Sequence, residues 1–185
     1  SLDTLQKEND LPIVGVVEPT CRRALLVTKN KKIGMIATLA SVRSGAYEAT
    51  LRRLDRSVEV QCLPCPLFVP LVENGRFRPG DVVIETVARE YLEPLKATGI
   101  DTLILGCTHY PLLADIISAI MGPEVTLVSA GEESAFELKR MLKANGLRAD
   151  ESRQGEPEFY VSDRPEDFER IASVFLQEDL RHTAR

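Results

Sequence analysis

A cysteine and a histidine two residues apart follow a short aliphatic run near the middle of the chain. Leu103-Ile104-Leu105 leads into Gly106-Cys107-Thr108-His109, and a second apolar stretch follows. In an open α/β sheet the ligand crevice lies outside the carboxyl ends of the strands, so a side chain at this point faces a ligand rather than the core. The pattern therefore predicts a reactive thiol at the end of a buried strand.

The chemistry expected of this segment is proton transfer. Unpaired N–H groups at the start of a helix favour negative charge, so we expect the pKa of Cys107 to be lowered from about 8.5 towards neutrality. His109 is close enough to exchange protons with the thiol or a substrate, and Thr108 offers a hydroxyl and an amide to a carboxylate. The alternative is that Cys107 is a small buried hydrophobic residue, as most unpaired cysteines are. The polar residues between two apolar elements argue against it.

Three segments of the sequence resemble motifs of the glutamate racemase family. Gly106–Leu113 resembles the family's second cysteine motif, Cys65–Glu73 its internal signature, and Ile36–Tyr47 its loop for the substrate carboxylate. The last segment departs from the family at Ser41, where threonine is usual, and at Ala37, where glycine is usual. A hydroxyl is kept at position 41, so the expected contact survives.

The resemblance implies a cofactor-independent racemase that interconverts L- and D-glutamate and supplies D-glutamate for peptidoglycan. In the family, a thiolate takes the α-proton from one face and a thiol returns one to the other. Cys107 would be the cysteine that acts on L-glutamate, His109 would assist it, and Glu73 would help to manage its protonation. The substrate carboxylates would be held by four residues: Thr38, Ser41, Thr108 and His109.

Each of these residues also has a purely structural interpretation. Glu73 could be an exposed carboxylate at a helix end, and Thr38 and Ser41 could serve only as turn and capping residues. His109 could simply satisfy backbone groups near the cleft. Nothing in the sequence resembles a pyridoxal-phosphate lysine site or a nucleotide-binding glycine loop, so no cofactor and no metal are expected.

The family's first cysteine motif, Cys-Asn-Thr-Ala, and its preceding Asp-Ser-Gly loop do not occur in these 185 residues. The sequence is therefore interpreted as a fragment that is inactive alone. A further departure is Ser129-Ala130-Gly131, where the family commonly has Asp-Ser-Gly. Two alternatives stay open: a single-cysteine relative of the superfamily, either a decarboxylase or a diacid isomerase, and a non-catalytic binding module.

Composition limits the class of protein and its partners. Hydrophobic residues make up 44% and charged residues 28%, as in ordinary soluble globular proteins. The net charge of −5 gives no reason to expect nucleic acid or an anionic membrane as a partner. No apolar stretch approaches the roughly 20 residues that span a bilayer. We expect a cytoplasmic protein that binds glutamate.

The four cysteines are expected to be reduced thiols rather than a disulfide framework. Cys62 and Cys65 form a Cys-x-x-Cys pair, which raises a redox or a zinc interpretation. Zinc needs four ligands, and only two histidines and two scattered cysteines are left to complete the set. The redox interpretation is the minority one, since the family resemblance already accounts for Cys65-Pro66.

The order of elements predicts an α/β fold, a doubly wound parallel sheet, because short apolar runs alternate with longer helical patterns. Strands are expected at Ile13–Val17, Ile33–Thr38, Val58–Leu63, Thr102–Gly106, Val125–Ser129 and Glu158–Ser162. Helices are expected after Ser41 or Ser44 through Leu54, from Pro79 to Gly99, from Pro111 to Gly122, from Glu132 to Asn145 and from Glu166 to Gln177, with a frayed tail at 178–185.

The resemblance also implies a map of two similar domains with the active site between them. Residues 1–17 would be a remnant of the first domain, 18–129 an intact α/β domain carrying the second cysteine, and 130–185 a segment that returns to the first domain. The incomplete domain would expose apolar helix faces at Phe136, Leu142 and Phe175. Exposed apolar patches drive association, so we expect a homo-oligomer.

Overall fold

The computed structural model describes residues 2–150, 152, 155, 157–162 and 164–176. Four parallel strands form one sheet in the order β2-β1-β3-β4. Their bounds are β1 Lys32–Ala37, β2 Glu59–Pro64, β3 Thr102–Leu105 and β4 Thr126–Ser129. Helices flank the sheet, which confirms the predicted α/β fold with a parallel sheet.

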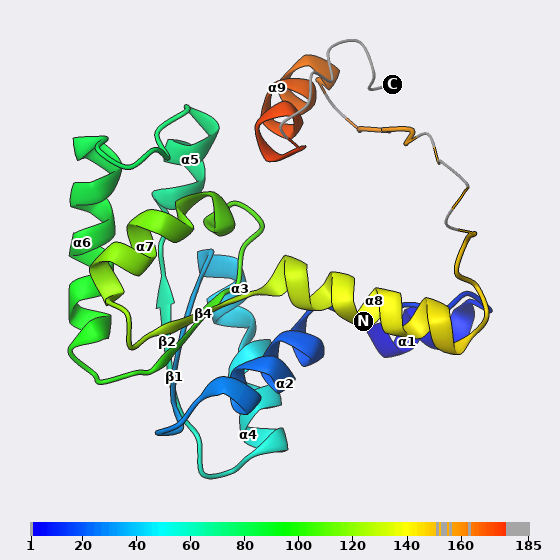
Figure 1. Cartoon of the computed structure of the whole chain (residues 1–185), viewed down its shortest axis with the longest axis horizontal. Helices are drawn as coiled ribbons and strands as arrows, with labels where there is room; N and C mark the ends of the chain where they lie inside the picture. The colour runs from blue at the N-terminus through cyan, green and yellow to red at the C-terminus, as the bar shows by residue number, and fades with distance from the viewer. Residues whose placement is uncertain (1, 151, 153–154, 156, 163, 177–185) are drawn as a thin grey trace. The chain divides into compact units, whose positions relative to one another are not determined.

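Helices connect the strands, and further helices precede β1 and follow β4 (Figure 1). They are α1 Leu2–Glu8, α2 Val17–Val27, α3 Leu39–Ser44, α4 Ala46–Leu54, α5 Phe68–Glu73, α6 Val82–Lys96, the 3₁₀ turn η1 Tyr110–Leu113, α7 Ala114–Met121, α8 Ala130–Ala144 and α9 Pro165–Leu176. The helix expected after Ser41 or Ser44 through Leu54 is α4, and a separate helix, α3, precedes it, because Gly45 adopts a left-handed conformation with φ 64° and ends α3.

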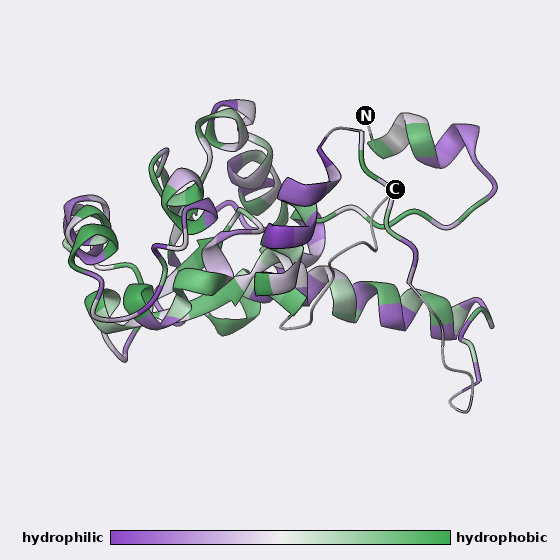
Figure 2. Ribbon diagram, turned by 90° about the horizontal axis from the view of Figure 1, so that it is seen from above, coloured by the Kyte–Doolittle hydropathy of each residue, from purple (hydrophilic) through white to green (hydrophobic). Residues whose placement is uncertain are grey.

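The sheet is covered on both faces because its strand side chains alternate. Ile36, Leu103 and Leu105 point into a core with α5, α6 and α7, whereas Met35 and Ile104 point into a second core with α2 and α4. All of these strand side chains are buried. Figure 2 shows the strands mostly in green, with purple residues on the surrounding helices. Strands that are covered on both faces have continuous apolar sequences, and this pattern predicts the four strands of the sheet.

Two expected strands are wrong. Residues 13–16 precede α2 without strand pairing, and the backbone carbonyl of Ile13 accepts a bond of 3.0 Å from the side-chain amide of Gln6. Within 158–162, Phe159 is a single bridge residue rather than part of a strand. A short apolar run has the same sequence pattern whether or not it pairs with another strand. It becomes a β-strand only when a neighbouring strand pairs with it. The expected tail at 178–185 lies outside the described residues.

The chain divides into two compact units, one up to Leu147 and one from Arg148 onward. The first contains the sheet and helices α1 to α8. The second contains α9, and within it the rings of Phe159 and Phe168 lie 5.7 Å apart. The predicted map of racemase domains, with boundaries at residues 17 and 129, stays a prediction.

Candidate active site

The expected site lies where the strand connections change direction. After β1 the chain passes through α3 and α4 to β2, and after β3 it passes through η1 and α7 to β4, on the other side of β1. β1 and β3 are neighbours, with Ile36 opposite Leu105. In open α/β sheets, ligands bind at the carboxyl edge where the strand order reverses. Here that edge carries Thr38, which follows β1, and Cys107, which follows β3.

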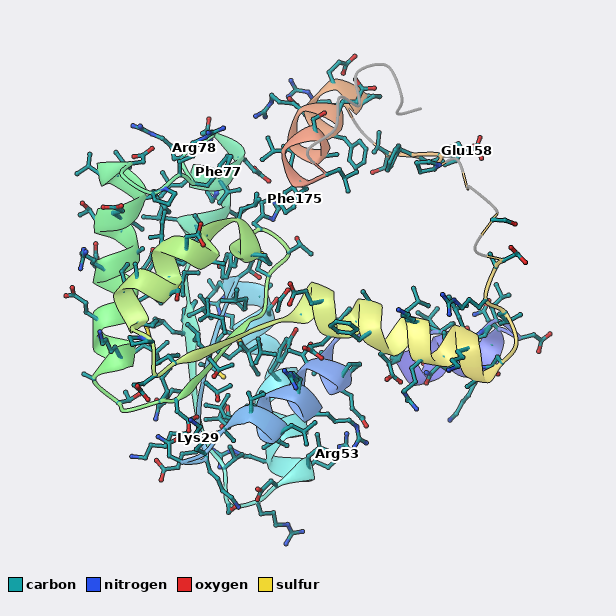
Figure 3. All side chains as sticks on the ribbon, in the orientation of Figure 1. Lys29, Arg53, Phe77, Arg78, Glu158 and Phe175 are labelled. Atoms are coloured by element: carbon teal, nitrogen blue, oxygen red, sulfur yellow. The ribbon has the colours of Figure 1, made fainter. Side chains whose placement is uncertain are left out.

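The two ends of the sheet carry different groups. Lys29 lies in the loop before β1, at the amino end of the sheet, and Phe77 and Arg78 lie in the loop after α5, at the opposite end (Figure 3). At the amino end, Asp101 accepts hydrogen bonds from the Thr28 hydroxyl at 2.6 Å and the Lys29 N–H at 2.7 Å. These bonds fix the turn before β1, so Asp101 has a structural role at this end of the sheet.

Three predicted residues form a chain of contacts at that carboxyl end. Sγ of Cys107 lies 3.9 Å from Nδ1 of His109, and Nε2 of His109 lies 3.1 Å from Oε1 of Glu73. The Thr108 hydroxyl is 3.3 Å from the same Nδ1. An ionised carboxylate only accepts hydrogen bonds, so Nε2 carries a proton, and in the neutral ring Nδ1 presents its lone pair towards the sulfur. This arrangement can move a proton between thiol and imidazole.

Helix α5 positions Glu73, which comes from a distant part of the chain. Phe68 and Val72 are buried in the core and fix this short helix, and Glu73, its last residue, reaches His109. The Glu73 side chain is 39% exposed and that of His109 only 18%. Because it contacts His109, Glu73 is more than an exposed carboxylate at a helix end.

The expectation of a lowered pKa for Cys107 is wrong. Burial raises the pKa of this thiol above its usual range, and the nearby Glu73 carboxylate also raises it. Hydrogen bonds from Thr108 and the His109 backbone act in the lowering direction but do not outweigh burial. The 3₁₀ turn η1 precedes α7, which begins only at Ala114, and this separates the thiol from the helix end that was expected to lower its pKa.

Thr38 and Ser41 lie together, but part of their role is structural. The two hydroxyls are 3.1 Å apart, and the Ser41 N–H donates to the Thr38 hydroxyl at 3.4 Å. Thr38 is therefore the N-cap of α3, as the structural interpretation expected. Both residues are half-buried at the edge that carries Cys107. A carboxylate contact from these hydroxyls stays a prediction.

Gly106 lets the cysteine loop pass close to β1. Its N–H donates to the Ile36 carbonyl at 2.8 Å. A Cβ at this position would lie 3.2 Å from that carbonyl oxygen, from Ala37 Cβ and from Met35 Sδ. These contacts are tighter than a side chain normally makes, so glycine favours the close approach that places Cys107 beside β1.

The other cysteines are poorly suited to this chemistry. Cys21 and Cys65 are fully buried, and burial raises their pKa values to about 12. Burial raises the pKa of Cys62 to about 11. Cys62 packs with the core of α2 and α4, whereas Cys65 belongs to the core of α5 to α7, so their side chains lie on opposite faces of the sheet. This placement argues against a Cys-x-x-Cys redox or zinc site.

The described residues hold few other groups that could form a site. No three His, Cys, Asp or Glu side chains in this part of the chain gather to hold a metal ion, and none of its helices is long and apolar enough to cross a membrane. Two cavities of about 510 and 470 Å³ lie among α1, α2 and α8, away from Cys107. Their charged groups already pair with each other, as in Arg22–Glu18 and Arg140–Glu137, both at 2.6 Å.

Comparison with known proteins identifies the family. A family profile described as Asp/Glu/Hydantoin racemase matches residues 1–135. The chain belongs to this family. As a member of the Asp/Glu/Hydantoin racemase family, it is 41% identical over 180 residues to a glutamate racemase from Exiguobacterium sibiricum, in a match that covers 97% of this chain. The resemblance to glutamate racemases found in the sequence is thereby confirmed.

Solved structures of family members agree with the fold. The structure of glutamate racemase isoform RacE1 from Bacillus anthracis matches with a TM-score of 0.87 and 37% identity, covering all of this chain and 68% of that one. A glutamate racemase from Francisella tularensis, in complex with D-glutamate, matches with a TM-score of 0.85 and 32% identity, covering 99% of this chain and 66% of that one. The chain spans 66% of the length of the Exiguobacterium relative.

Sequence reasoning missed one residue of the site region. Tyr110 directly follows His109, is fully buried, and donates a hydrogen bond from its hydroxyl to the Cys65 carbonyl at 3.0 Å. The available signal was a tyrosine between the polar Thr108-His109 pair and Pro111, since a buried tyrosine usually finds a partner for its hydroxyl. That partner, 45 residues earlier in the chain, could not be read from the sequence.

Proposed function

We propose that this chain supplies one half of a glutamate racemase site, with Cys107 as the base that acts on L-glutamate. The observation that carries the proposal is the continuous contact from Cys107 through His109 to Glu73 at the reversal point of the sheet. Membership of the racemase family supports it, as does the D-glutamate bound in the Francisella relative.

The proposed reaction begins with proton transfer from the Cys107 thiol to Nδ1 of His109. The thiolate then removes the α-proton of L-glutamate, and the electron pair of the C–H bond moves into the neighbouring carboxylate. A thiol on the opposite face donates a proton to the α-carbon and gives D-glutamate. Hydroxyls of Thr38, Ser41 and Thr108 would stabilise the charge on the substrate carboxylates. We propose that no cofactor takes part.

Inversion needs acid–base groups on both faces of the α-carbon. The three remaining cysteines do not qualify, since Cys21 and Cys65 are fully buried and Cys62 lies within β2, packed against the core of α2 and α4. We therefore propose that these 185 residues alone form negligible D-glutamate. Robust racemisation by the isolated chain would show that another group replaces the second thiol.

The decisive experiment joins these 185 residues to the part of the Exiguobacterium racemase outside the match, giving a hybrid chain. In D₂O with L-glutamate, the hybrid should form D-glutamate with deuterium at the α-carbon. Cys107→Ala should abolish this, whereas the matched control Cys62→Ala should not. A folded hybrid that neither exchanges nor inverts, or a Cys107→Ala hybrid that keeps its activity, would remove the racemase proposal.

A one-thiol reaction is the second candidate, because Cys107 is the cysteine that follows a strand at the carboxyl edge and is only partly buried. The same experiment separates the two. Deuterium entering L-glutamate without inversion would favour protonation from one face, as expected of a decarboxylase or diacid isomerase. Binding of glutamate without exchange would favour a non-catalytic module.

In the cell, we propose that the complete enzyme supplies D-glutamate for peptidoglycan from the cytoplasm. Expression of the active hybrid in a bacterium that requires D-glutamate should restore growth without added D-glutamate. Failure of the active hybrid to restore growth would argue against this role.

We also propose self-association of the 185-residue chain. Leu26 and Phe136 are 78% and 65% exposed, and both line the cavity of about 470 Å³ between α2 and α8. Leu142 and Phe175 are only half-exposed, so the predicted apolar faces are smaller than expected. Light scattering should show a dimer or larger species, and Phe136→Ser should shift it towards monomer. A monodisperse monomer in dilute solution would contradict the proposal.

A further inference from the structure

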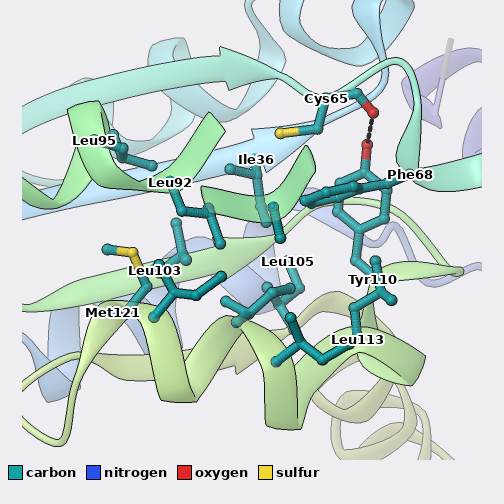
Figure 4. Packing of buried hydrophobic residues seen from close by; sticks show 14 of the residues in the cluster. Ile36, Cys65, Phe68, Leu92, Leu95, Leu103, Leu105, Tyr110, Leu113 and Met121 are labelled. Atoms are coloured by element: carbon teal, nitrogen blue, oxygen red, sulfur yellow. Dashed lines mark hydrogen bonds between the residues drawn. The ribbon is translucent and has the colours of Figure 1, made fainter. Parts of the chain in front are cut away.

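The Tyr110 hydroxyl joins the two segments that carry the proposed proton path. One segment is the loop after β3, which holds Cys107 and His109, and Tyr110 is its next residue. The other starts at Cys65, whose carbonyl accepts the Tyr110 hydroxyl at 3.0 Å, and it continues into α5. Figure 4 shows this bond as the dashed line between Tyr110 and Cys65.

The surrounding packing leaves little freedom to this bond. The ring of Phe68, in the first turn of α5, lies edge-on to Tyr110 with centroids 5.2 Å apart and edge-on to Tyr91 at 5.4 Å. Cys65, Phe68 and Tyr110 are all fully buried. The Cys65 carbonyl also accepts the Phe68 N–H at 3.2 Å. The Tyr110 hydroxyl therefore attaches to the turn that begins α5.

We propose that Tyr110 is a positioning residue for the Cys107–His109–Glu73 path, an inference that rests on the proposed function. Its hydroxyl fixes the cysteine loop against the start of α5, and α5 carries Glu73 at its end. The bond thereby holds Nε2 of His109 against Glu73 and keeps Nδ1 turned to the Cys107 sulfur. Outer partners of this kind commonly orient a functional histidine and fix which nitrogen carries the proton.

Tyr110→Phe is a clean test because it keeps the buried ring. The Cys65 carbonyl would still accept the Phe68 N–H, so no buried carbonyl is left without a partner. Tyr91→Phe, in α6, is the matched control, since it removes a hydroxyl that bonds to the Leu67 backbone in the same turn but leaves the bond from Tyr110 to Cys65 in place. Both variants are made in the 185-residue chain, and circular dichroism verifies folding.

Two measurements report on the site without requiring turnover. The ring ¹⁵N signals of His109 report which nitrogen is protonated, and the His182→Ala variant assigns them, since the chain has two histidines. Peptide mass spectrometry gives the rate at which iodoacetamide alkylates Cys107. In Tyr110→Phe the ¹⁵N pattern should move towards a mixture of the two neutral forms. Alkylation should slow roughly threefold to tenfold, the range expected for loss of one buried hydrogen bond. Tyr91→Phe should change neither.

A double-mutant cycle with Glu73→Gln distinguishes positioning from general loosening. If Tyr110 acts through the Glu73–His109 contact, Tyr110→Phe should have no further effect in the Glu73→Gln background. 3-Fluorotyrosine at position 110 keeps the hydroxyl and should preserve both readouts. 4-Fluorophenylalanine fills the same space without a donor, and it provides the test should Tyr110→Phe fail to fold. Unchanged readouts in Tyr110→Phe, or full additivity with Glu73→Gln, would overturn the positioning role alone. Unchanged readouts in Glu73→Gln would instead count against the proposed function.

Discussion

At the scale of single residues, the state of the Cys107 thiol decides what the site can do. Burial raises its pKa, so most of the thiol is protonated near neutral pH and a nearby base is needed to ionise it. We propose Nδ1 of His109, 3.9 Å from the sulfur, as that base, since the bond from Nε2 to Glu73 would leave its lone pair available. The reactivity of Cys107 therefore depends on its neighbours more than on its own position in the chain.

Thr38 offers a test of substrate binding at the same scale. Thr38→Val in the hybrid chain should raise the KM for L-glutamate about tenfold with a smaller change in kcat. The reason is that the hydroxyl is proposed to hold the carboxylate both in the bound substrate and in the transition state. The loss of the α3 cap should also cost about 1 kcal/mol of folding free energy. Thr38→Ser, which keeps the hydroxyl, should restore both. An unchanged KM in Thr38→Val would leave Thr38 as a cap only.

At the scale of elements, the site depends on how closely β3 and its loop approach β1. Glycine at position 106 permits the bond from its N–H to Ile36 at 2.8 Å, and this fixes where the loop leaves the sheet. After β3 the chain continues into η1 and α7, on the sheet face that α5 to α7 cover. After β1 it continues into α3 and α4, and α4 packs on the opposite face of the sheet. The site thus forms at the edge between two diverging connections.

Gly106→Ala should destabilise the chain by about 1–3 kcal/mol, because the added carbon meets three atoms of β1 at 3.2 Å and these atoms must shift. The matched control is Gly131→Ala in α8, where the nearest atom is Ser129 Oγ at 3.8 Å. This second change should stabilise the chain by roughly 0.5–1 kcal/mol through helix propensity. Urea unfolding measures both. Equal stability of the two variants would contradict the close approach at Gly106.

At the scale of the whole molecule, two apolar cores on opposite faces of the sheet each enclose cysteines. Cys65 lies in the core with α5 to α7, and Cys21 lies in the core with α2 and α4. Their pKa values are about 12 in the folded chain, against an ordinary value of 9.0. The folded state therefore holds protons on these thiols at alkaline pH that the unfolded state releases.

This difference predicts loss of stability in alkali. The contribution of each thiol is complete below about pH 9 and is lost as the pH rises towards about 12, because the folded pKa is the higher one. At about pH 10.5 one such thiol should cost about 2 kcal/mol of unfolding free energy. Urea unfolding at about pH 8 and pH 10.5 measures the loss, and Cys65→Ala should make it smaller by that amount. A Cys65→Ala chain with the same pH dependence as the parent would contradict this account.

The four strands of the sheet, the helices between them and the cysteine motif could be predicted because each is a local pattern. Buried strands are continuous apolar runs, and the helices repeat apolar residues every three or four positions. The extra strands at 13–17 and 158–162 were wrong because a strand also needs a partner, and pairing is not a local property. Similarly, the pKa of Cys107 was misjudged because burial depends on what covers the thiol.

The amino-acid sequence by itself determined the kinds of groups present: a thiol, an imidazole and hydroxyls placed just after apolar strands. The tertiary structure alone decided which of them meet. The Glu73 contact with His109 spans 36 residues and the Tyr110 bond to Cys65 spans 45. Such contacts depend on how α5 packs on the sheet, and hydrophobic packing is a sum over many residues that no single spacing encodes.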